Sequence, residues 1–277
     1  ASGGRIFNSF AKGSITYKNS AVATTGQYTD LNIGGLVGRV EGGEIEKARS
    51  EVAIVIEAAT PKSSSAYYPC VGGIVGYATG ATIKGTTNYS SITWKDAAAA
   101  SSTGMKVFIG GTIGYLPAGC TFSDNVNEGA LAVKNGANQL YLGGIAGLSR
   151  AEMDNCLNAG DLDASATFGR GMIGGVVGLF NEGQVLGLTL ENAQNTGSIN
   201  IGTSYYITDR SGIGGIVGYA YPKTYVANCK NAGPITFAGS SRSGGPNSAL
   251  TSDGNANIAI GGVAGLDFSS RIYDCVN

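Results

Sequence analysis

The sequence contains no histidine, and this absence excludes several classes of enzyme site. Ser-His-Asp and Cys-His nucleophiles need an imidazole base, and many zinc centres need imidazole ligands. Charged residues are also scarce, because they make up 13% of the chain, about half of the usual ~25%. The formal net charge is −1 without a block of basic residues, which argues against a nucleic-acid-binding protein.

Long apolar runs and prolines are scarce as well. No stretch of 18 apolar residues occurs, so the sequence predicts no membrane-spanning helix in this segment. There are six prolines and no three-residue glycine period, which excludes a collagen-like chain. Hydrophobic residues nevertheless make up 43% of the chain, enough to form a core. Glycine is abundant instead, with 46 of 277 residues against a usual share of about 7%.

A glycine motif recurs seven times along the chain. Its first copy is IGGLVG, and every copy has the form apolar-Gly-Gly-x-apolar-Gly. The copies begin at Ile33, Val71, Ile109, Leu142, Ile173, Ile213 and Ile260, at spacings of 31 to 47 residues. Such repetition predicts a repeat architecture. It differs from a dinucleotide-binding fingerprint, because no helical segment follows and no acidic residue stands at a fixed distance downstream.

Two further elements follow the motif in each repeat. The segment MDNCLNAGDL, from Met153, has a small residue and then an asparagine two positions later. That asparagine recurs as Asn88, Asn127, Asn158, Asn195, Asn231 and Asn277. A short stretch with apolar-polar alternation, such as SITWK, comes next and is typical of a strand with one buried face. The pattern therefore predicts that each repeat forms three short strands and a variable tail.

These patterns predict an all-β fold, a β-solenoid or right-handed parallel β-helix of about seven three-stranded rungs. The asparagines are expected to form a ladder from rung to rung. A structural role is also expected for the second glycine of each motif, where each rung bends or packs closely on its neighbour. These glycines are Gly35, Gly73, Gly111, Gly144, Gly175, Gly215 and Gly262. Residues 1–277 form a single domain, and because the terminal repeats are incomplete we expect a piece of a longer protein.

The repeated Gly-apolar-x-Gly cores resemble the GLUG motif of bacterial surface proteins, which include regions of some IgA-cleaving metallopeptidases and large adhesin-like proteins. The matching residues are Gly35–Gly38, Gly73–Gly76, Gly111–Gly114, Gly144–Gly147, Gly175–Gly178, Gly215–Gly218 and Gly262–Gly265. The resemblance implies a β-solenoid at the cell surface or outside the cell, with no catalytic residue to transfer. On this basis we expect flanking domains in the same chain and partners among host or surface glycans or proteins.

Aromatic residues are the candidates for binding. Tyr17, Trp94 and Phe237 share a column with Val133 and Ile201 and are expected in the core. Three tyrosines follow the glycine motif at a position that other repeats fill with leucine, which also favours packing: Tyr77, Tyr115 and Tyr219. Tyrosines in the polar tails could stack on sugars or anchor a partner, or could instead lie against the solenoid. These candidates are Tyr28, Tyr67, Tyr68, Tyr205 and Tyr206.

Carboxylate chemistry is the enzymatic alternative. A carbohydrate-active β-helix enzyme, a polysaccharide lyase or a glycosidase, would use acidic residues on an outer face, and Asp161 and Asp163 are the best pair. The other interpretation is that such acids only keep a weakly charged surface soluble. We therefore expect a non-catalytic stalk or adhesin module without a cofactor or a metal site.

The five cysteines allow two interpretations. Cys156, Cys229 and Cys275 fall in the column of small residues that precedes the asparagine, so they can be small buried apolar residues. Alternatively, Cys229 and Cys275 could form a disulfide between neighbouring rungs, because adjacent strands lie about 4.8 Å apart. The sequence leaves this choice open.

Overall fold

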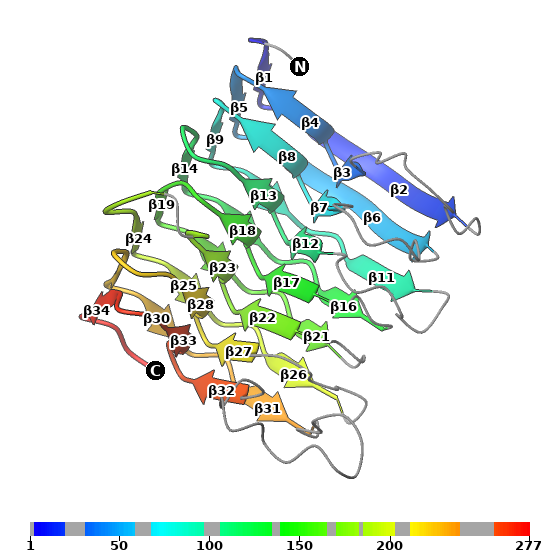
Figure 1. Ribbon diagram of the computed structural model, residues 1–277. Coiled ribbons are helices and arrows are strands. Elements are labelled where there is room, and N and C mark those ends of the chain that lie inside the picture. The colour runs from blue at the N-terminus through cyan, green and yellow to red at the C-terminus, as the bar shows by residue number, and fades with distance from the viewer. Residues whose placement is uncertain are drawn as a thin grey trace, which may run out of the picture.

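The computed structural model describes residues 3–19, 31–58, 68–96, 106–134, 139–164, 170–182, 185–202, 211–238 and 258–277. These residues form 34 strands that pair in parallel, and no helix occurs among them. The N-terminal strands lie at one end of a long stack and the C-terminal strands at the other (Figure 1). The predicted β-solenoid is confirmed.

Four parallel sheets run along the stack. Sheet I contains β1 (Arg5–Phe7), β5 (Glu44–Glu46), β9 (Thr82–Lys84), β14 (Thr121–Ser123), β19 (Met153–Asp154), β24 (Thr189–Glu191), β29 (Tyr225–Ala227) and β34 (Arg271–Tyr273). Sheet II contains, in spatial order, β30 (Lys230–Asn231), β25 (Gln194–Asn195), β20 (Leu157–Asn158), β15 (Val126–Asn127), β10 (Thr87–Asn88), β6 (Arg49–Ala58), β11 (Ile92–Asp96), β16 (Leu131–Val133), β21 (Leu162–Ala164), β26 (Ile199–Ile201) and β31 (Ile235–Phe237), with β2 (Phe10–Asn19) beside β6.

The strands of the glycine motif form the other two sheets. Sheet III contains β3 (Asn32–Gly34), β7 (Cys70–Gly72), β12 (Lys106–Gly110), β17 (Gln139–Gly143), β22 (Arg170–Gly174), β27 (Ser211–Gly214) and β32 (Ile258–Gly261). Sheet IV contains β4 (Val37–Glu41), β8 (Val75–Thr79), β13 (Ile113–Leu116), β18 (Ala146–Ser149), β23 (Val177–Phe180), β28 (Val217–Ala220) and β33 (Ala264–Asp267).

One turn of the solenoid visits sheets III, IV and I and then sheet II twice, as β12, β13, β14, β15 and β16 do. The prediction of three strands in each rung is therefore wrong, because a turn of this kind has five. The Gly-Gly bend divides the motif into two strands instead of one. A second bend, after the asparagine, separates a two-residue strand from the alternating strand that follows.

Apolar side chains stack in register in two separate internal columns. One column lies between sheets III and II, where Ile109 pairs with Val71 on one side and Leu142 on the other. Trp94 belongs to this column and is 1% exposed, and Tyr17 and Phe237 pack against it, as predicted. The second column lies between sheets IV and I and includes Ile145. Burial of these side chains is the main driving force for winding.

The asparagines bond from turn to turn from Asn88 to Asn277. Asn88 Nδ2 donates to Asn127 Oδ1 at 2.8 Å. The same bond continues through Asn158, Asn195, Asn231 and Asn277 at 2.7 to 2.8 Å. Nδ2 also donates to the carbonyl two residues later, as from Asn127 to Gly129 at 2.9 Å. The predicted asparagine ladder is confirmed, and it satisfies polar groups that are buried.

The second glycine faces this ladder in six of the seven motifs, and Gly35 in the first motif faces Ser50 instead. A Cβ at Gly144 would lie 2.2 Å from Asn158 Cγ and 2.1 Å from the carbonyl oxygen of Gly175. None of the seven second glycines has a positive φ. They are therefore required because the backbone and the amide approach closely, and not because the chain is left-handed there. We refer to these glycines and the ladder asparagines together as the glycine–asparagine seam.

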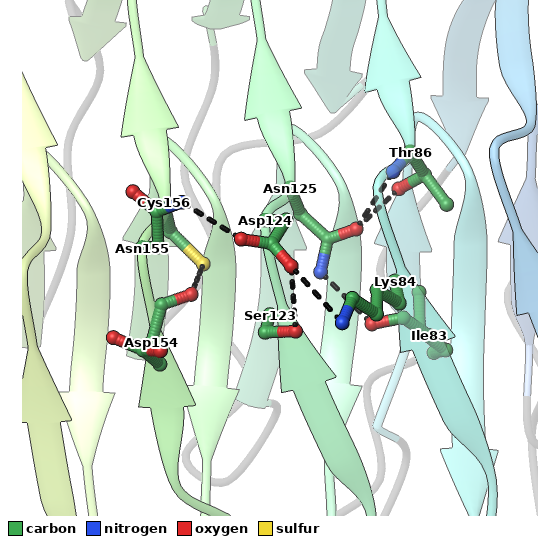
Figure 2. Close-up of polar contacts among 9 residues, drawn as sticks. All are labelled: Ile83, Lys84, Thr86, Ser123, Asp124, Asn125, Asp154, Asn155 and Cys156. Carbon is green, nitrogen blue, oxygen red and sulfur yellow. Dashed lines mark hydrogen bonds and ion pairs between the residues drawn. The ribbon is translucent and has the colours of Figure 1, made fainter.

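The left-handed corner lies elsewhere, between sheets I and II. One residue in each of eight turns has a φ of 48° to 61°: Asn8, Lys47, Gly85, Asp124, Asn155, Asn192, Asn228 and Asp274. Asn, Asp and Gly are the residues that tolerate this conformation best. The next residue is small and buried in the central turns, as Asn125 and Cys156 are (Figure 2). Asn125 Oδ1 accepts bonds from Thr86 N at 3.0 Å and Thr86 Oγ1 at 2.8 Å.

All five cysteines are free thiols. Cys229 and Cys275 lie on adjacent turns, and the backbone N–H of Cys229 donates to Cys275 Sγ at 3.4 Å. Burial raises the pKa of Cys156 to about 12 and also raises the pKa of Cys229. Both thiols therefore act here as the small buried side chains that the column requires.

Candidate functional site

Sheets III and IV fold back on each other at the Gly-Gly bend. A Cβ at Gly114 of β13 would lie 2.4 Å from the backbone nitrogen of Val71 in β7, so glycine allows the two sheets to touch. Away from the glycines, larger side chains fill the space between the sheets. Phe108 of β12 and Tyr115 of β13 face each other with ring centroids 5.5 Å apart. Together with their neighbours they form a third apolar cluster, outside the two internal columns.

Two columns in register form the walls of this space. The wall from sheet III carries Asn32, Cys70, Phe108, Tyr141 and Met172 on successive turns. The wall from sheet IV carries Arg39, Tyr77, Tyr115, Leu148 and Leu179. Tyr141 and Leu148 belong to the same apolar cluster and are only 2% and 1% exposed. The first two turns have only Asn32 and Cys70 on the wall from sheet III, and there the space stays open.

The open space is a pocket of about 630 Å³, a size typical of small-molecule sites. Its aromatic lining comes from Tyr68, Tyr77, Phe108 and Tyr115. Its charged lining comes from Arg39, Lys106, Arg150 and Glu182. We call this pocket, whose lining also includes Asn32, Cys70 and Leu148, the aromatic groove.

The rings of the groove are fixed by their neighbours. Tyr77 and Tyr115 meet edge to face with centroids 5.4 Å apart, and Tyr68 lies 6.1 Å from Phe108. Each tyrosine also has a cation over its ring. The distances to the ring centroids are 4.9 Å for Arg39 Cζ on Tyr77, 5.6 Å for Arg150 Cζ on Tyr115 and 5.8 Å for Lys106 Nζ on Tyr68. These contacts hold aromatic faces and positive charges side by side.

Glu182 connects the two walls of the groove. Its Oε1 accepts a bond from Lys106 Nζ at 2.8 Å, and its Oε2 pairs with Arg150. Lys106 begins β12 in sheet III, whereas Arg150 directly follows β18 in sheet IV. The three side chains are 22% to 27% exposed. Burial raises the pKa of Glu182, but the bonds and charges of Lys106 and Arg150 outweigh burial and lower its pKa below the usual value.

Tyr115 is a neutral member of the groove. Burial raises its pKa to about 12, although the charge of Arg150 acts in the opposite direction. The phenol therefore keeps its proton at physiological pH and can donate one hydrogen bond as well as accept one. The groove thus combines apolar ring faces, a neutral hydroxyl donor and three cationic side chains.

Of the five tyrosines predicted to bind a ligand, the structure describes one. Tyr68 lines the groove and is half-buried. Tyr28, Tyr67, Tyr205 and Tyr206 lie outside the described residues. Tyr77 and Tyr115 do pack, as the sequence predicted, but they also line the groove.

The charged members of the groove were missed by sequence analysis. Arg39 shares a column with Tyr77, and this replacement of an aromatic residue by a cation was a readable signal. Lys106 and Glu182 lie 76 residues apart and on different turns, so no local pattern connects them.

The acidic pair considered for catalysis does not line the groove. Asp163 lies in β21 of sheet II, and Asp161 just before it accepts bonds from Ser198 N at 2.8 Å and Ser198 Oγ at 2.7 Å. These bonds lower the pKa of Asp161. Asp124 is similarly bound by Asn155 Nδ2 at 2.7 Å, which lowers its pKa (Figure 2). In the described part of the chain, no group of three or more acidic or cysteine side chains could hold a metal ion.

Within the described ranges, no helix is long and apolar enough to cross a membrane. Comparisons of the chain with protein-family models, with curated proteins and with solved structures found no match. The resemblance to the GLUG motif therefore stays an expectation, and function is inferred from the solenoid and its aromatic groove.

Proposed function

We propose that this chain is a non-catalytic repeat module of a bacterial cell-surface or secreted protein, in which a solenoid stalk presents a glycan-binding groove. The observation that carries this proposal is the aromatic groove itself. It is an open pocket lined by four aromatic side chains, of which Tyr77, Phe108 and Tyr115 lie on strands.

The chemistry of the lining suits a saccharide. A sugar ring has apolar C–H faces that can lie on tyrosine rings, and it has hydroxyl groups that need donors and acceptors. Tyr77 and Tyr115 offer such rings at neighbouring turns of sheet IV. Because the strands are held by the buried seam, the groove is already formed before a ligand arrives, which reduces the entropy cost of binding.

The charges in the groove favour binding over hydrolysis. Glycosidases use two carboxyl groups, about 5 to 9.5 Å apart, and one of them must carry a proton. The described lining of the groove contains one carboxyl group, that of Glu182, and its pKa is lowered by Lys106 and Arg150. An ionised carboxylate held by two cations is a poor proton donor.

The test is a glycan array followed by titration calorimetry with the glycans retained. Tyr77→Ala and Tyr115→Ala should each weaken binding about tenfold, because each removes a stacking face. Tyr89→Ala is the matched control, since Tyr89 is 43% exposed and lies beside sheet II. It should leave affinity unchanged.

Two outcomes would contradict the proposal. One is an array without any retained glycan. The other is turnover of a bound glycan that is lost in Asp161→Ala, which would instead support a carbohydrate-active enzyme with its site on sheet II.

A further inference from the structure

We propose that the aromatic groove selects acidic saccharides, whose carboxylate is bound by Lys106 and Arg150 in place of Glu182. This inference rests on the proposed glycan-binding function and adds the chemical class of the ligand. It concerns sugars such as uronic or sialic acids, in which a carboxylate is attached directly to the ring.

The balance of charge in the groove is positive. Arg39, Lys106 and Arg150 line it together with the single carboxylate of Glu182. Arg39 also pairs with Glu41 at 2.8 Å, but both of these side chains are about half exposed, so water screens that pair. Lys106 and Arg150 are about three-quarters buried, and they share one carboxylate between two positive charges. An arriving anion would find uncompensated charge in a site of reduced dielectric constant.

Glu182 marks where a ligand carboxylate would bind. It uses one oxygen for Lys106 and the other for Arg150, which is how a bound carboxylate would bridge the same two side chains. Arg150 has donor capacity to spare, because its Nε is buried and has no hydrogen-bond partner among the described residues. Glu182 follows β23, one turn beyond Arg150 and two beyond Lys106, so it reaches the groove from the edge of the pocket.

The rings lie where the rest of such a sugar would be. Arg150 Cζ is 5.6 Å from the centroid of Tyr115, and Tyr115 is 5.4 Å from Tyr77. A carboxylate held at Arg150 therefore places the sugar ring within reach of Tyr115. We therefore expect a free small anion to bind less tightly than an acidic sugar, since it would make no contact with the aromatic faces.

The experiment compares acidic oligosaccharides with their carboxyl-reduced counterparts, so that only the charge differs. Calorimetry is run at low ionic strength on the wild-type chain, using uronic-acid and sialic-acid oligosaccharides as the probes. The acidic form should bind at least about tenfold more tightly than the reduced form, as expected for a charge-assisted contact. Arg150→Gln and Lys106→Gln should each remove most of this preference, because they should weaken binding of the acidic form far more than binding of the reduced form.

Glu182→Gln tests the displacement directly. Because the competing carboxylate is gone while both cations remain, affinity for the acidic probes should rise about fivefold. Lys12→Gln is the control for net charge, since Lys12 pairs with Glu51 on sheet II and is 72% exposed. It should change neither affinity nor preference. Thermal melting of each variant verifies that the fold is intact, and either of the two cation variants alone is sufficient if the other does not fold.

The failures of the two proposals can be told apart. Equal binding of the acidic and reduced forms, with both weakened by Tyr115→Ala, would overturn acid selectivity and keep glycan binding. Weaker binding of the acidic form by Glu182→Gln would overturn the displacement of Glu182. Absence of binding by both forms, together with an array that retains no glycan, would contradict the proposed function itself.

Discussion

In the glycine–asparagine seam the same residues recur in successive turns from Asn88 to Asn277, whereas in the aromatic groove the same positions change from turn to turn. The seam requires the same residue at successive turns, because each asparagine inside the ladder accepts a bond from one neighbouring asparagine and donates a bond to the other. The wall of the groove in sheet IV runs instead from Arg39 through Tyr77 and Tyr115 to Leu148. Because its residues vary, the space between sheets III and IV is an open pocket at one end and is filled by side chains beyond it.

The difference separates two tasks. Uniform columns specify the winding, since one amide bonds to the turns before and after it. Variable columns determine the shape of the binding surface, because the size of the facing side chains decides whether the space between sheets III and IV is filled. Substitutions in the seam should therefore damage the fold, and substitutions in the groove should damage binding. The four predictions below test that separation.

The largest effect is expected from Gly175→Val in the seam. A Cβ there would lie 2.0 Å from the carbonyl oxygen of Gly215 and 2.4 Å from Asn195 Cγ. Since one contact is backbone, the turns must separate, and the free energy of unfolding should fall by at least about 3 kcal/mol. Urea denaturation followed by circular dichroism measures the change.

Gly119→Asn is the control for this substitution. Gly119 has a φ of +80° and no atom within 4 Å of its added Cβ. Asparagine tolerates such a backbone, so the loss should stay below about 1 kcal/mol. If the two variants were equally stable, close packing would not be the reason for glycine in the seam.

The next effect is expected from Asn158→Ala in the ladder. Asn127 Nδ2 loses one of its two acceptors and Asn195 Oδ1 loses the donor from Asn158, and both groups are buried. Unsatisfied buried groups of this kind should lower the free energy of unfolding by about 2–3 kcal/mol. Asn200→Ala is the control, because Asn200 is exposed on the outer face of β26 and should cost less than about 0.5 kcal/mol. Equal losses would mean that the ladder adds no stability of its own.

The seam was predictable from the sequence because it depends on repetition. Asn127 and Asn158 occupy equivalent positions in successive repeats, and stacking of repeats brings equivalent positions together. Because both residues are asparagine, their stacked side chains can form the amide–amide hydrogen bond. The same logic placed Trp94 in the core, since neighbouring repeats carry apolar residues in its column.

Tyr68 was a predicted binding residue, but the groove as a whole was not predictable, because it depends on contacts between unlike positions. Tyr115 faces Phe108 only because Gly114 lets β13 lie against β7 of the previous turn. The alternation pattern does not reveal this fold-back, and the same bend made the expected count of three strands wrong. The pairing of Lys106 with Glu182 spans two turns and has no counterpart in other repeats.

As the pH falls, the interactions of the groove should be lost before those of the seam. Burial raises the pKa of Glu182, yet Lys106 and Arg150 lower it further, so the net pKa lies below its unfolded value. Its stabilising contribution is therefore complete above the unfolded pKa of about 4.3 and is lost as pH falls through the lower folded pKa. The amides of the seam do not titrate. We expect a loss of about 1–2 kcal/mol from this bridge below that range.

Nuclear magnetic resonance separates the two regions during this titration. Signals of Tyr115 should shift as Glu182 is protonated, while hydrogen exchange of the ladder amides should stay slow. Glu182→Gln should abolish the shift of Tyr115, and the losses that remain would belong to other carboxylates with lowered pKa, such as Asp124 and Asp161. If the ladder amides exchanged their hydrogens rapidly as soon as Glu182 is protonated, the stability of the seam would depend on the groove.

The smallest effect on stability is expected from Tyr115→Leu. Leucine already fills this column at Leu148 and Leu179, so the position accepts it without rearrangement of β13. The free energy of unfolding should change by less than about 1 kcal/mol, whereas glycan affinity should fall about tenfold because the ring is gone. Urea denaturation and calorimetry on the same sample give both numbers. A destabilisation equal to that of Asn158→Ala would make Tyr115 part of the scaffold, because a variable column would then contribute as much to winding as a uniform one.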